Sequence, residues 1–490
     1  MSRFYVTTAI PYVNASPHLG HALEFVEADV LARSHRLRGD DVRFLSGTDD
    51  NALKNVLAAE EADTPVEDYV RERADEFEQL GRLLGLSLDD YIRTSTDPRH
   101  RPGVERLWSA TDTSGDLYVR DYEGLYCVGC EQFYRQAELL DGLCPEHGTE
   151  PETVSERNWF FRLSRYSGPL LEAIESGLLR IEPEARRNEV VSFIEAGLED
   201  ISVSRSAERA HGWGIPVPAD PDQVIYVWYD ALGNYITSLG YGTDQADYRT
   251  WWIESDERVH VIGKGILRFH AVYWPAFLLS AGEPIPTAIF VHDYLTIGGE
   301  KISKSTGNVI DPTDLVNVYG ADPLRWWFCT DVPRRGDADF TEERLIERAN
   351  ADLANGYGNL VNRITTLVEK HRPNGAPPPP ENDPLLQLAD ETGREVHERL
   401  DRFDIRGAAS AIADLIRAAN AYIQNCRPWE QARVNDNAGF NHTIGSLWAT
   451  TIQIGQHLQN FTPELAAKAL GQLERGTSGV VQPRLEARSS

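Results

Sequence analysis

The first 47 residues read as a strand, a helix and a second strand, and this order restricts the possible fold more than any other feature of the chain. Residues 4–10 and 42–47 are rich in β-branched and aromatic side chains, which favour strands. Residues 21–38 between them carry apolar side chains at helical spacing, and Gly39 can end that helix. Two strands joined by a helix are parallel neighbours with a right-handed crossover. The sequence therefore predicts an α/β fold with a parallel sheet, whose ligand crevice lies at the carboxyl ends of its strands.

The rest of the chain divides by its sequence pattern. Strand character returns at 224–228, 259–262 and 288–291, and the region from 117 to 215 interrupts it, so the sheet is split by an insertion. After residue 350 the pattern becomes helical, with candidate helices at 352–370, 383–400, 405–424 and 441–459. We expect the first half of the core in 1–116, a connective insertion in 117–215, the second half of the core in 216–292, a short segment in 293–350, an α-helical bundle in 351–475 and a frayed tail in 476–490.

Charge and hydropathy exclude several functional classes. The formal net charge of −28 argues against a general nucleic-acid binder, although a local basic patch could still meet a large acceptor. No apolar run approaches the ~20 residues that cross a bilayer, so we expect no membrane partner. The first residues lack the basic and apolar regions of a signal peptide, and we expect a cytoplasmic location.

Two short runs are suited to binding phosphate. His18-Leu-Gly-His21 places two imidazoles at the expected helix start, where open backbone N–H groups and the helix dipole favour anions. Lys301-Ile-Ser-Lys304-Ser places two ammonium groups on a Ser/Gly-rich loop, where they can neutralise the charge that builds as pyrophosphate leaves. A solvated surface loop is the alternative interpretation of the lysine run. Together the two runs predict a site that holds a nucleoside triphosphate from both ends.

Three of the five cysteines form a cluster that ends in a histidine. Cys127 and Cys130 are followed by Cys144 and His147, and two ligand pairs on two tight turns have the spacing of a structural zinc knuckle. The alternative is a vestigial knuckle that folds without metal. Cys329 and Cys426 are isolated, and we expect them to serve as packing residues.

These motifs resemble those of a known family. The histidine and lysine runs are similar to the two signatures of class I aminoacyl-tRNA synthetases, and the wider sequence resembles the methionyl-tRNA synthetases over residues 4 to 460. The resemblance rests on the cysteine knuckle and on the runs Ala9-Ile-Pro-Tyr-Val-Asn-Ala-Ser-Pro-His-Leu-Gly-His21, Trp213-Gly-Ile-Pro216, Tyr226-Val-Trp-Tyr-Asp-Ala231, Ile262-Gly-Lys264, Asn359-Leu-Val-Asn-Arg363 and Pro428-Trp429.

The resemblance implies a Rossmann-type parallel sheet split by a zinc-bearing connective insertion, and it also implies a reaction and a domain plan. The carboxylate of methionine, or of a similar amino acid, would attack the α-phosphate of ATP, with Mg²⁺ on the phosphates, and the acyl group would then pass to tRNA. A carboxylate is already a nucleophile at neutral pH, so the first step needs positioning and charge stabilisation rather than a general base. The segment 293–350 would contact the tRNA stem, the helical bundle would read the anticodon, and the enzyme would be a monomer.

The resemblance also assigns residues. The catalytic residues would be His18, His21, Lys301 and Lys304. The amino acid would contact Ile10, Tyr12, Asp49, Arg205, Trp228, Ala231, Tyr235, Ile266 and His270, with Asp49 on its ammonium group. Plain core packing is the alternative for Trp228 and Tyr235. ATP would contact His18, Gly20, His21, Gly263, Lys264, His292, Lys301 and Lys304. The zinc ligands would be Cys127, Cys130, Cys144 and His147, and the anticodon would contact Asn359, Arg363 and Trp429.

The chain departs from the family pattern near the expected site. Asn51 and Ala52 stand where a histidine and a glycine are usual, Gly265 replaces an aspartate, and Asp293 replaces a glycine. Two hypotheses stay open: a methionine–tRNA ligase with drifted neighbours of the site, or a paralogue that passes the activated amino acid to a small amine or hydroxylamine, as hydrazine-forming relatives do. A non-catalytic relic is a third reading, which the surviving motif histidines and lysines disfavour.

Overall fold

The chain forms two compact units, which are described separately below. The structure is a computed structural model, and it describes residues 2–129, 132–134, 136–145, 148–301 and 310–488. The first unit contains residues 1–17, 38–80 and 87–292, and the second contains residues 18–37, 81–86 and 293–490. The finer division of the chain into an insertion, a stem segment and a bundle stays a prediction.

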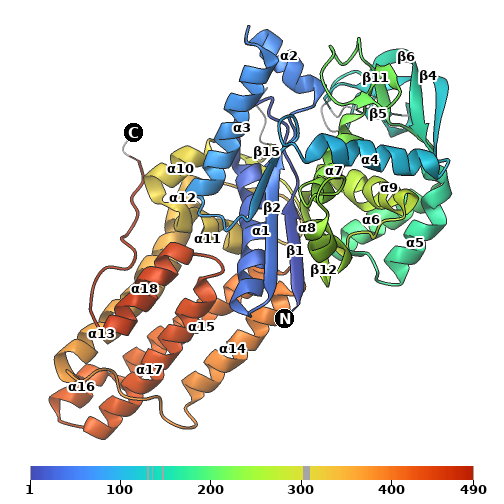
Figure 1. The fold of residues 1–490 in the computed structure, drawn as a ribbon. Coiled ribbons are helices and arrows are strands. Elements are labelled where there is room, and N and C mark those ends of the chain that lie inside the picture. The colour runs from blue at the N-terminus through green and yellow to red at the C-terminus, as the bar shows by residue number, and fades with distance from the viewer. Residues whose placement is uncertain (1, 130–131, 135, 146–147, 302–309, 489–490) are drawn as a thin grey trace. The chain divides into compact units, whose positions relative to one another are not determined.

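A six-stranded parallel sheet forms the centre of the first unit, which confirms the predicted α/β class (Figure 1). All its neighbouring strands pair in parallel, and it contains both strands predicted in the first 47 residues. Its strands, in spatial order, are β3 (Asp90–Arg93), β2 (Asp41–Thr48), β1 (Arg3–Thr8), β12 (Glu257–Gly263), β13 (Ala288–His292) and β7 (Arg180–Glu182). The edge strand β7 comes from within 117–215, so part of the predicted insertion belongs to the main sheet.

The strand order reverses between β1 and β12. From β1 the chain proceeds to β2 and β3 on one side, whereas β12 leads to β13 on the other. In doubly wound sheets a ligand crevice forms at this reversal, beyond the carboxyl ends of the strands. Thr8 stands opposite Val261 in the register, so the segments that follow β1 and β12 leave the sheet at the same edge.

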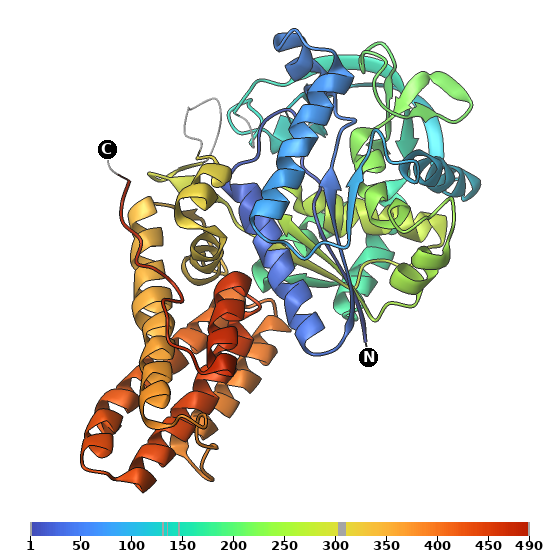
Figure 2. The same cartoon turned by 60° about the vertical axis from the view of Figure 1, so that its left-hand side comes forward.

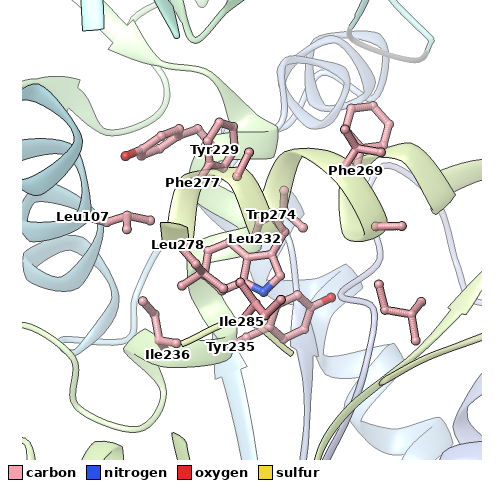
Figure 3. Close-up of a cluster of buried hydrophobic side chains, with 14 of the residues drawn as sticks. Leu107, Tyr229, Leu232, Tyr235, Ile236, Phe269, Trp274, Phe277, Leu278 and Ile285 are labelled. Carbon is pink, nitrogen blue, oxygen red and sulfur yellow. The ribbon is translucent and has the colours of Figure 1, made fainter. Parts of the chain in front are cut away.

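Helices and a buried aromatic cluster complete the core of the first unit. Figure 3 shows side chains from α4, α7 and α9 packed together, and the rings of Trp274 and Tyr235 have centroids 6.0 Å apart. The longer helices of this unit are α2 (Leu53–Glu61), α3 (Val66–Leu83, whose last residues belong to the second unit), α4 (His100–Thr113), α5 (Ser167–Glu175), α6 (Glu184–Glu195), α7 (Val227–Thr237) and α9 (Trp274–Ala281). Its shorter helical turns are η2 (Leu163–Tyr166), α8 (Ala246–Tyr248), η3 (Arg249–Ile253), η4 (Lys264–Ile266) and η5 (Phe269–Tyr273).

Two small antiparallel sheets have strands in the predicted insertion, and two strands of the second sheet, β10 and β11, lie just beyond its predicted end. One has the order β5-β4-β6-β8 and the other β10-β11-β9. Their bounds are β4 (Leu117–Cys127), β5 (Gln132–Tyr134), β6 (Glu152–Phe161), β8 (Ile201–Ser202), β9 (Ser204–Ser206), β10 (Pro216–Val217) and β11 (Asp220–Ile225), with a short turn η1 (Gln136–Glu138) after β5.

The parallel strand predicted at 224–228 is wrong. Its first residues end β11, which pairs antiparallel with β9 and β10, and from Val227 onward the chain is helical in α7. A short apolar run is compatible with both a buried strand and a buried helix, and periodicity alone does not separate them. The hairpin partners of β11 and the helical packing of α7 decided the outcome.

The second unit is helical, as expected for the last third of the chain. Helices α14, α15, α17 and α18 pack against one another (orange to red in Figure 2). Its helices are α1 (Leu19–Leu37), α10 (Pro312–Tyr319), α11 (Ala321–Asp331), α12 (Glu342–Arg348), the π-helix η7 (Ala349–Gly358), α13 (Asn359–His371), α14 (Pro384–Leu400), α15 (Ile405–Cys426), α16 (Pro428–Arg433), α17 (Asn437–Leu458) and α18 (Pro463–Arg475). The four predicted helices are present, whereas α18 was not predicted.

The described part of the second unit also contains three short strands and a C-terminal segment that is hydrogen-bonded to its helices. The strands are β14 (Leu295–Ile297), β15 (Glu300–Lys301) and β16 (Ala338–Asp339). Residues 477–488, in the segment where we expected fraying, form no helix or strand, but Gly479 donates its N–H to Asn362 and Leu485 exchanges two hydrogen bonds with Asn350. Among the helices of the described ranges, none combines the length and apolar character needed to cross a lipid bilayer.

A buried ion pair ties α1 into the second unit. Arg325 of α11 is fully buried and donates to the Asp29 carboxylate of α1 at 2.7 Å, and to the backbone carbonyls of Leu84 and Phe461. Arg33, one turn along α1, donates to the same carboxylate oxygen at 2.7 Å. One guanidinium therefore joins α1, the loop after α3, α11 and the turn before α18.

We expect Arg325→Met to destabilise the second unit by about 3–5 kcal/mol, because it removes the fully buried one of the two guanidinium groups that pair with Asp29 and leaves two buried carbonyls without their donor. Arg417→Met is the matched control, since Arg417 pairs with Asp414 on the exposed face of α15 and such pairs contribute at most about 1 kcal/mol. Urea unfolding followed by circular dichroism measures both variants. Equal, small losses in the two variants would contradict the structural role of Arg325.

Candidate functional site

Aromatic side chains from three segments meet at the edge where β1 and β12 end. Tyr12, after β1, lies edge-on to Trp228 of α7, with ring centroids 5.9 Å apart. Trp228 stacks on Phe269 of η5 at 3.8 Å and lies edge-on to His270 at 6.3 Å. Three of the predicted amino-acid-binding residues are thus brought together, while Phe269 was missed because no spacing in the sequence links it to Trp228.

Tyr235 and His270 form a neutral, hydrogen-bonded wall of this site. The Nδ1 of His270 lies 2.9 Å from the Ile266 carbonyl, which can only accept, so Nδ1 carries the proton. The Nε2 of His270 therefore accepts from the Tyr235 hydroxyl at 2.7 Å. Complete burial lowers the pKa of His270 to about 4, so the imidazole is uncharged at neutral pH.

A second buried imidazole supports that wall from the sheet. His260 of β12 stacks on Tyr235 at 4.0 Å and accepts at Nε2 from the Trp274 indole N–H. Its Nδ1 lies 2.8 Å from the Thr7 hydroxyl of β1, and burial lowers the pKa of His260 well below its usual value. Both histidines are therefore neutral, and the cation at this site is the ammonium of Lys54, which lies 4.2 Å from the centroid of the Tyr12 ring.

Asp49 supplies a carboxylate beside these aromatic residues. It follows β2, is 2% exposed, and forms an isolated β-bridge with Tyr12. Its N–H donates to the Pro11 carbonyl, and its own carbonyl accepts from the buried Asn55 amide. The N–H of Asn51 lies 3.2 Å from its carboxylate. The backbone of Asp49 is therefore held by the segment that also carries Tyr12.

The remaining predicted residues of the first unit lie on neighbouring segments. Ile10 and Ile266 are half-buried against the same core, and Ala231 is buried one turn along α7 from Trp228. Gly263 ends β12 and lies opposite His292 of β13, so a Cβ there would lie 3.4 Å from the His292 ring. Lys264 begins the turn that follows.

Arg205 is placed in a different environment. Its guanidinium lies 4.2 Å above the Tyr226 ring and donates to the Ser202 hydroxyl and the Ser204 carbonyl. It lines a cavity with Tyr122, Phe160 and Arg268, to which none of the other eight predicted amino-acid-binding residues contributes. A direct role of Arg205 in the amino-acid pocket stays a prediction.

The two motif histidines begin α1 in the second unit. Their rings stack at 3.8 Å. The N–H of His18 donates to Nδ1 of His21, and the N–H of Gly20 donates to Nδ1 of His18. Both Nδ1 atoms are acceptors, so in the neutral rings both Nε2 atoms carry a proton. A Cβ on Gly20 would approach the His18 ring to 2.9 Å, which explains the glycine.

The lysine run begins on a tight hairpin. Thr296 of β14 pairs with Lys301 of β15, and Gly298 and Gly299 make the turn with positive φ angles of 62° and 80°. Asp339 accepts from the Gly299 N–H and the Thr296 hydroxyl, and these hydrogen bonds hold the pKa of its carboxyl below the usual value. Lys304 lies outside the described residues.

Two of the four predicted zinc ligands are described. Cys127, at the end of β4, and Cys144 are both buried and pack in one cluster with Tyr134. The N–H of Gly148 donates to the Cys144 carbonyl at 2.8 Å and closes a tight turn there. Cys130 and His147 lie outside the described residues. Within the described ranges, no three His, Cys, Asp or Glu side chains form a group that could hold a metal ion.

Two of the three residues predicted to read an anticodon meet in the second unit. Arg363 of α13 lies 5.5 Å from the ring of Trp429 in α16. Trp429 is 39% exposed, and partial burial lowers the pKa of Arg363. Asn359 begins α13 one turn before Arg363. A cation over an exposed indole is a platform on which a base can stack.

The residues that depart from the family pattern adopt ordinary conformations or make hydrogen bonds in the structure. Ala52 has φ −71°, a value that any residue adopts, so its backbone conformation does not require a glycine. Asn51 donates its amide to Asp230, and Asp293 accepts from the N–H of Gly336 at 2.6 Å. Gly265 lies within the turn η4. Asp293 thus holds a neighbouring backbone turn.

The sequence matches one family over most of its length. The family model described as tRNA synthetases class I (M) matches residues 4–153 and 137–365. This chain belongs to the class I tRNA synthetases. The methionine–tRNA ligase of Caldanaerobacter subterraneus is 40% identical to this synthetase over 96% of this chain and 74% of the relative. That of Mycobacterium tuberculosis is 40% identical over 96% of this chain and 92% of the relative.

Solved structures agree with this assignment. The Mycobacterium tuberculosis methionyl-tRNA synthetase in complex with methionyl-adenylate is similar to this synthetase with a TM-score of 0.91 at 40% identity, over 96% of this chain and 93% of that chain. The apo form of the Mycobacterium tuberculosis enzyme has a TM-score of 0.85 at 36% identity, over 100% and 99% of the two chains.

We expect the imidazole of His270 to titrate near pH 4 rather than near its usual value of about 6.5. As the pH falls, His270 is protonated in the unfolded chain near pH 6.5, before it is protonated in the folded protein. The free energy of unfolding therefore keeps the full contribution of the neutral His270 above about pH 6.5 and loses it as the pH falls toward 4. NMR of ¹³C-labelled histidine, assigned with His270→Gln, measures the midpoint. A midpoint above 6 would contradict the neutral wall.

Proposed function

We propose that this synthetase is a methionine–tRNA ligase, which activates methionine with ATP as the aminoacyl adenylate and transfers the acyl group to tRNA. The observation that carries the proposal is the aromatic site with its neutral histidine beside a buried carboxylate, in a chain 40% identical to methionine–tRNA ligases over 96% of its length. Solved structures of methionyl-tRNA synthetases also align with 96% and 99% of this chain.

The site supports methionine by its polarity. A thioether is apolar and polarisable, and it packs well against aromatic rings. Tyr12, Trp228 and Phe269 provide such rings, and the neutral His270 avoids an unmatched charge beside the substrate side chain. The carboxylate of Asp49 gives the substrate ammonium a partner. Ile10, Ala231, Tyr235 and Ile266 would complete the pocket.

ATP binding would draw on several groups of this chain. The Nε2–H groups of His18 and His21 can donate to phosphate oxygens at the start of α1. Lys301 and Lys304 would stabilise the leaving pyrophosphate, and Mg²⁺ would bridge its oxygens. Gly20, Gly263, Lys264 and His292 would contact the nucleotide.

Transfer to tRNA is supported by the second unit. Arg363 and Trp429 form a stacking platform one turn from Asn359, and single-stranded bases bind such platforms. We infer that the segment 293–350 contacts the tRNA stem, and that the enzyme acts as a cytoplasmic monomer. A paralogue with a small-molecule acceptor is the alternative, because Asn51, Gly265 and Asp293 differ from the family pattern.

Zinc would be structural if bound. Cys127 and Cys144 are buried thiols that pack in one cluster, which fits a soft metal. With Cys130 and His147 they would complete a tetrahedron without an open position for water. The metal would then stabilise the insertion and take no part in the chemistry.

We expect methionine to drive ATP–pyrophosphate exchange, and Lys304→Ala to slow it by about 10²–10³-fold, the usual loss of one charge contact in such a transition state. Lys468→Ala, on the exposed face of α18, is the matched control and should leave the rate unchanged. Full activity of Lys304→Ala would remove the proposed role of the lysine loop.

The same protein distinguishes the two acceptors. The enzyme is incubated with labelled methionine and ATP, and either tRNA or hydroxylamine is added as the acceptor. With tRNA, we expect charged tRNA to form at about 1–10 turnovers per second. Adenylate formation followed by transfer only to the small nucleophile would favour the paralogue.

Metal analysis of the purified enzyme should find about one zinc per chain, and Cys130→Ser should lose it. Cys426→Ser, whose thiol ends α15, is the control and should retain the metal. We expect the Cys130 variant to become sensitive to proteolysis within residues 117–160, while ATP–pyrophosphate exchange is less affected. A metal-free enzyme with a protease-resistant insertion would contradict a zinc-dependent fold.

A further inference from the structure

A chain of buried polar groups leads from the interior of the first unit to Asp49. The Asn51 side-chain amide donates to Oδ2 of Asp230 at 2.8 Å, while the backbone N–H of Asn51 lies 3.2 Å from Oδ1 of Asp49. Oδ1 of Asp230 lies 2.5 Å from Nε2 of His100, and Nδ1 of His100 lies 2.8 Å from the Thr237 hydroxyl. Asp230 and His100 are 1% and 0% exposed, so water competes little for these contacts.

The packing of two helices fixes the inner end of this chain of contacts. His100 is the first residue of α4, and Asp230 lies in the first turn of α7. A Cβ on Gly103 would lie 2.4 Å from Thr237 and from the Tyr241 carbonyl, so α4 and α7 are in close contact one turn from His100. The same first turn of α7 carries Trp228 of the aromatic site. The position of Asp230 is therefore set by the packing of two helices in the core.

Both oxygens of Asp230 are engaged by the protein. One accepts from His100 and the other from Asn51, and these contacts leave Asp230 as an anchor rather than a substrate ligand. Asn51 joins this anchor to Asp49 through its own backbone, because its amide side chain and its N–H point to different carboxylates. A rotation of residue 51 would move the N–H that faces Asp49.

We propose that His100, Asp230 and Asn51 are positioning residues that hold the Asp49 carboxylate toward the α-ammonium group of the amino-acid substrate. This inference rests on the proposed function to the extent that Asp49 binds the ammonium. It explains how Asn51 replaces the histidine of the family pattern: an amide N–H can donate to Asp230 as an imidazole N–H would. The expected effect is on the binding of the ammonium alone, not on the thioether or on ATP.

The test compares methionine with methylthiobutanoate, the analogue that lacks only the α-ammonium group. For Asn51→Ala, we expect the Kd of methionine to rise about tenfold, the value of one hydrogen bond to a charged group. The Kd of methylthiobutanoate and the KM of ATP should change by less than about twofold, since neither ligand contacts Asp49. Asn51→His should restore the affinity for methionine, because it supplies an N–H to Asp230.

Ser95→Ala is the matched control. Its hydroxyl donates at 2.7 Å to Asp50, the carboxylate next to Asp49, so the variant loosens the same loop without touching the proposed chain of contacts. Ser95→Ala should not change the ratio of the Kd of methionine to the Kd of methylthiobutanoate. Asp230→Asn is the second variant, and it keeps the shape of Asp230 while removing its charge. If Asn51→Ala does not fold, the same comparison of the Kd values of methionine and methylthiobutanoate is made with Asp230→Asn, for which we expect a loss with methionine alone. The double variant should lose no more affinity than Asn51→Ala alone, because both substitutions break one contact.

Equal losses for methionine and methylthiobutanoate in Asn51→Ala, no loss for either, or the same separation in Ser95→Ala would overturn the proposal. If the unmodified enzyme activates an amino acid other than methionine, the proposed substrate is wrong. The same comparison is then made with that amino acid and its deaminated analogue, which tests the positioning residues independently of the side chain recognised.

Discussion

The parallel pairing of β1 with β12 is the constraint on which the aromatic site depends. The hydrogen bond between Thr7 and His260 joins residues 253 positions apart inside this pair. Because the two strands end in register at the reversal of strand order, Tyr12 and His270 are brought to one edge of the sheet. Both faces of β1 are buried, so a shift of one residue would exchange the side chains of its two faces and break the contact between Thr7 and His260, which couples the geometry of the site to the stability of the core.

Burial, rather than the identity of the residues alone, sets the chemistry of the site. A histidine in water near neutral pH is partly charged, but His270 is held neutral by desolvation, with its Nδ1 proton directed to the Ile266 carbonyl. The polar atoms of Tyr235 and His270 thereby satisfy one another, and this wall is uncharged. The carboxylate of Asp49 lies beside it, and in the proposed function this pairing lets one site bind both an apolar side chain and an ammonium group.

In the second unit, a buried ion pair joins segments that lie far apart in the sequence. Arg325 contacts Asp29 and two backbone carbonyls from separate parts of the chain, and its five N–H groups allow this in a single side chain. Helix α1, which begins with the two motif histidines, is thereby joined to the helices that follow residue 293. A sequence pattern shows α1 as amphipathic, but it gives no reason to expect a charged pair at its buried positions.

The opening strand, helix and strand were predictable because their signals are local: side-chain periodicity, a glycine at the helix end and β-branched runs. The late helices were predictable for the same reason, and the family resemblance located Trp228, Tyr235 and His270 as candidates. The run at 224–228 was misread because five apolar residues satisfy a strand and a helix equally. Only the tertiary structure decided that Trp228 lies on a helix, that Phe269 stacks on it, that Arg205 lines a separate cavity, and that His100 reaches Asn51 through Asp230. These outcomes depend on contacts between segments far apart in the chain, whose free energies come from packing and desolvation and leave no periodic trace in the sequence.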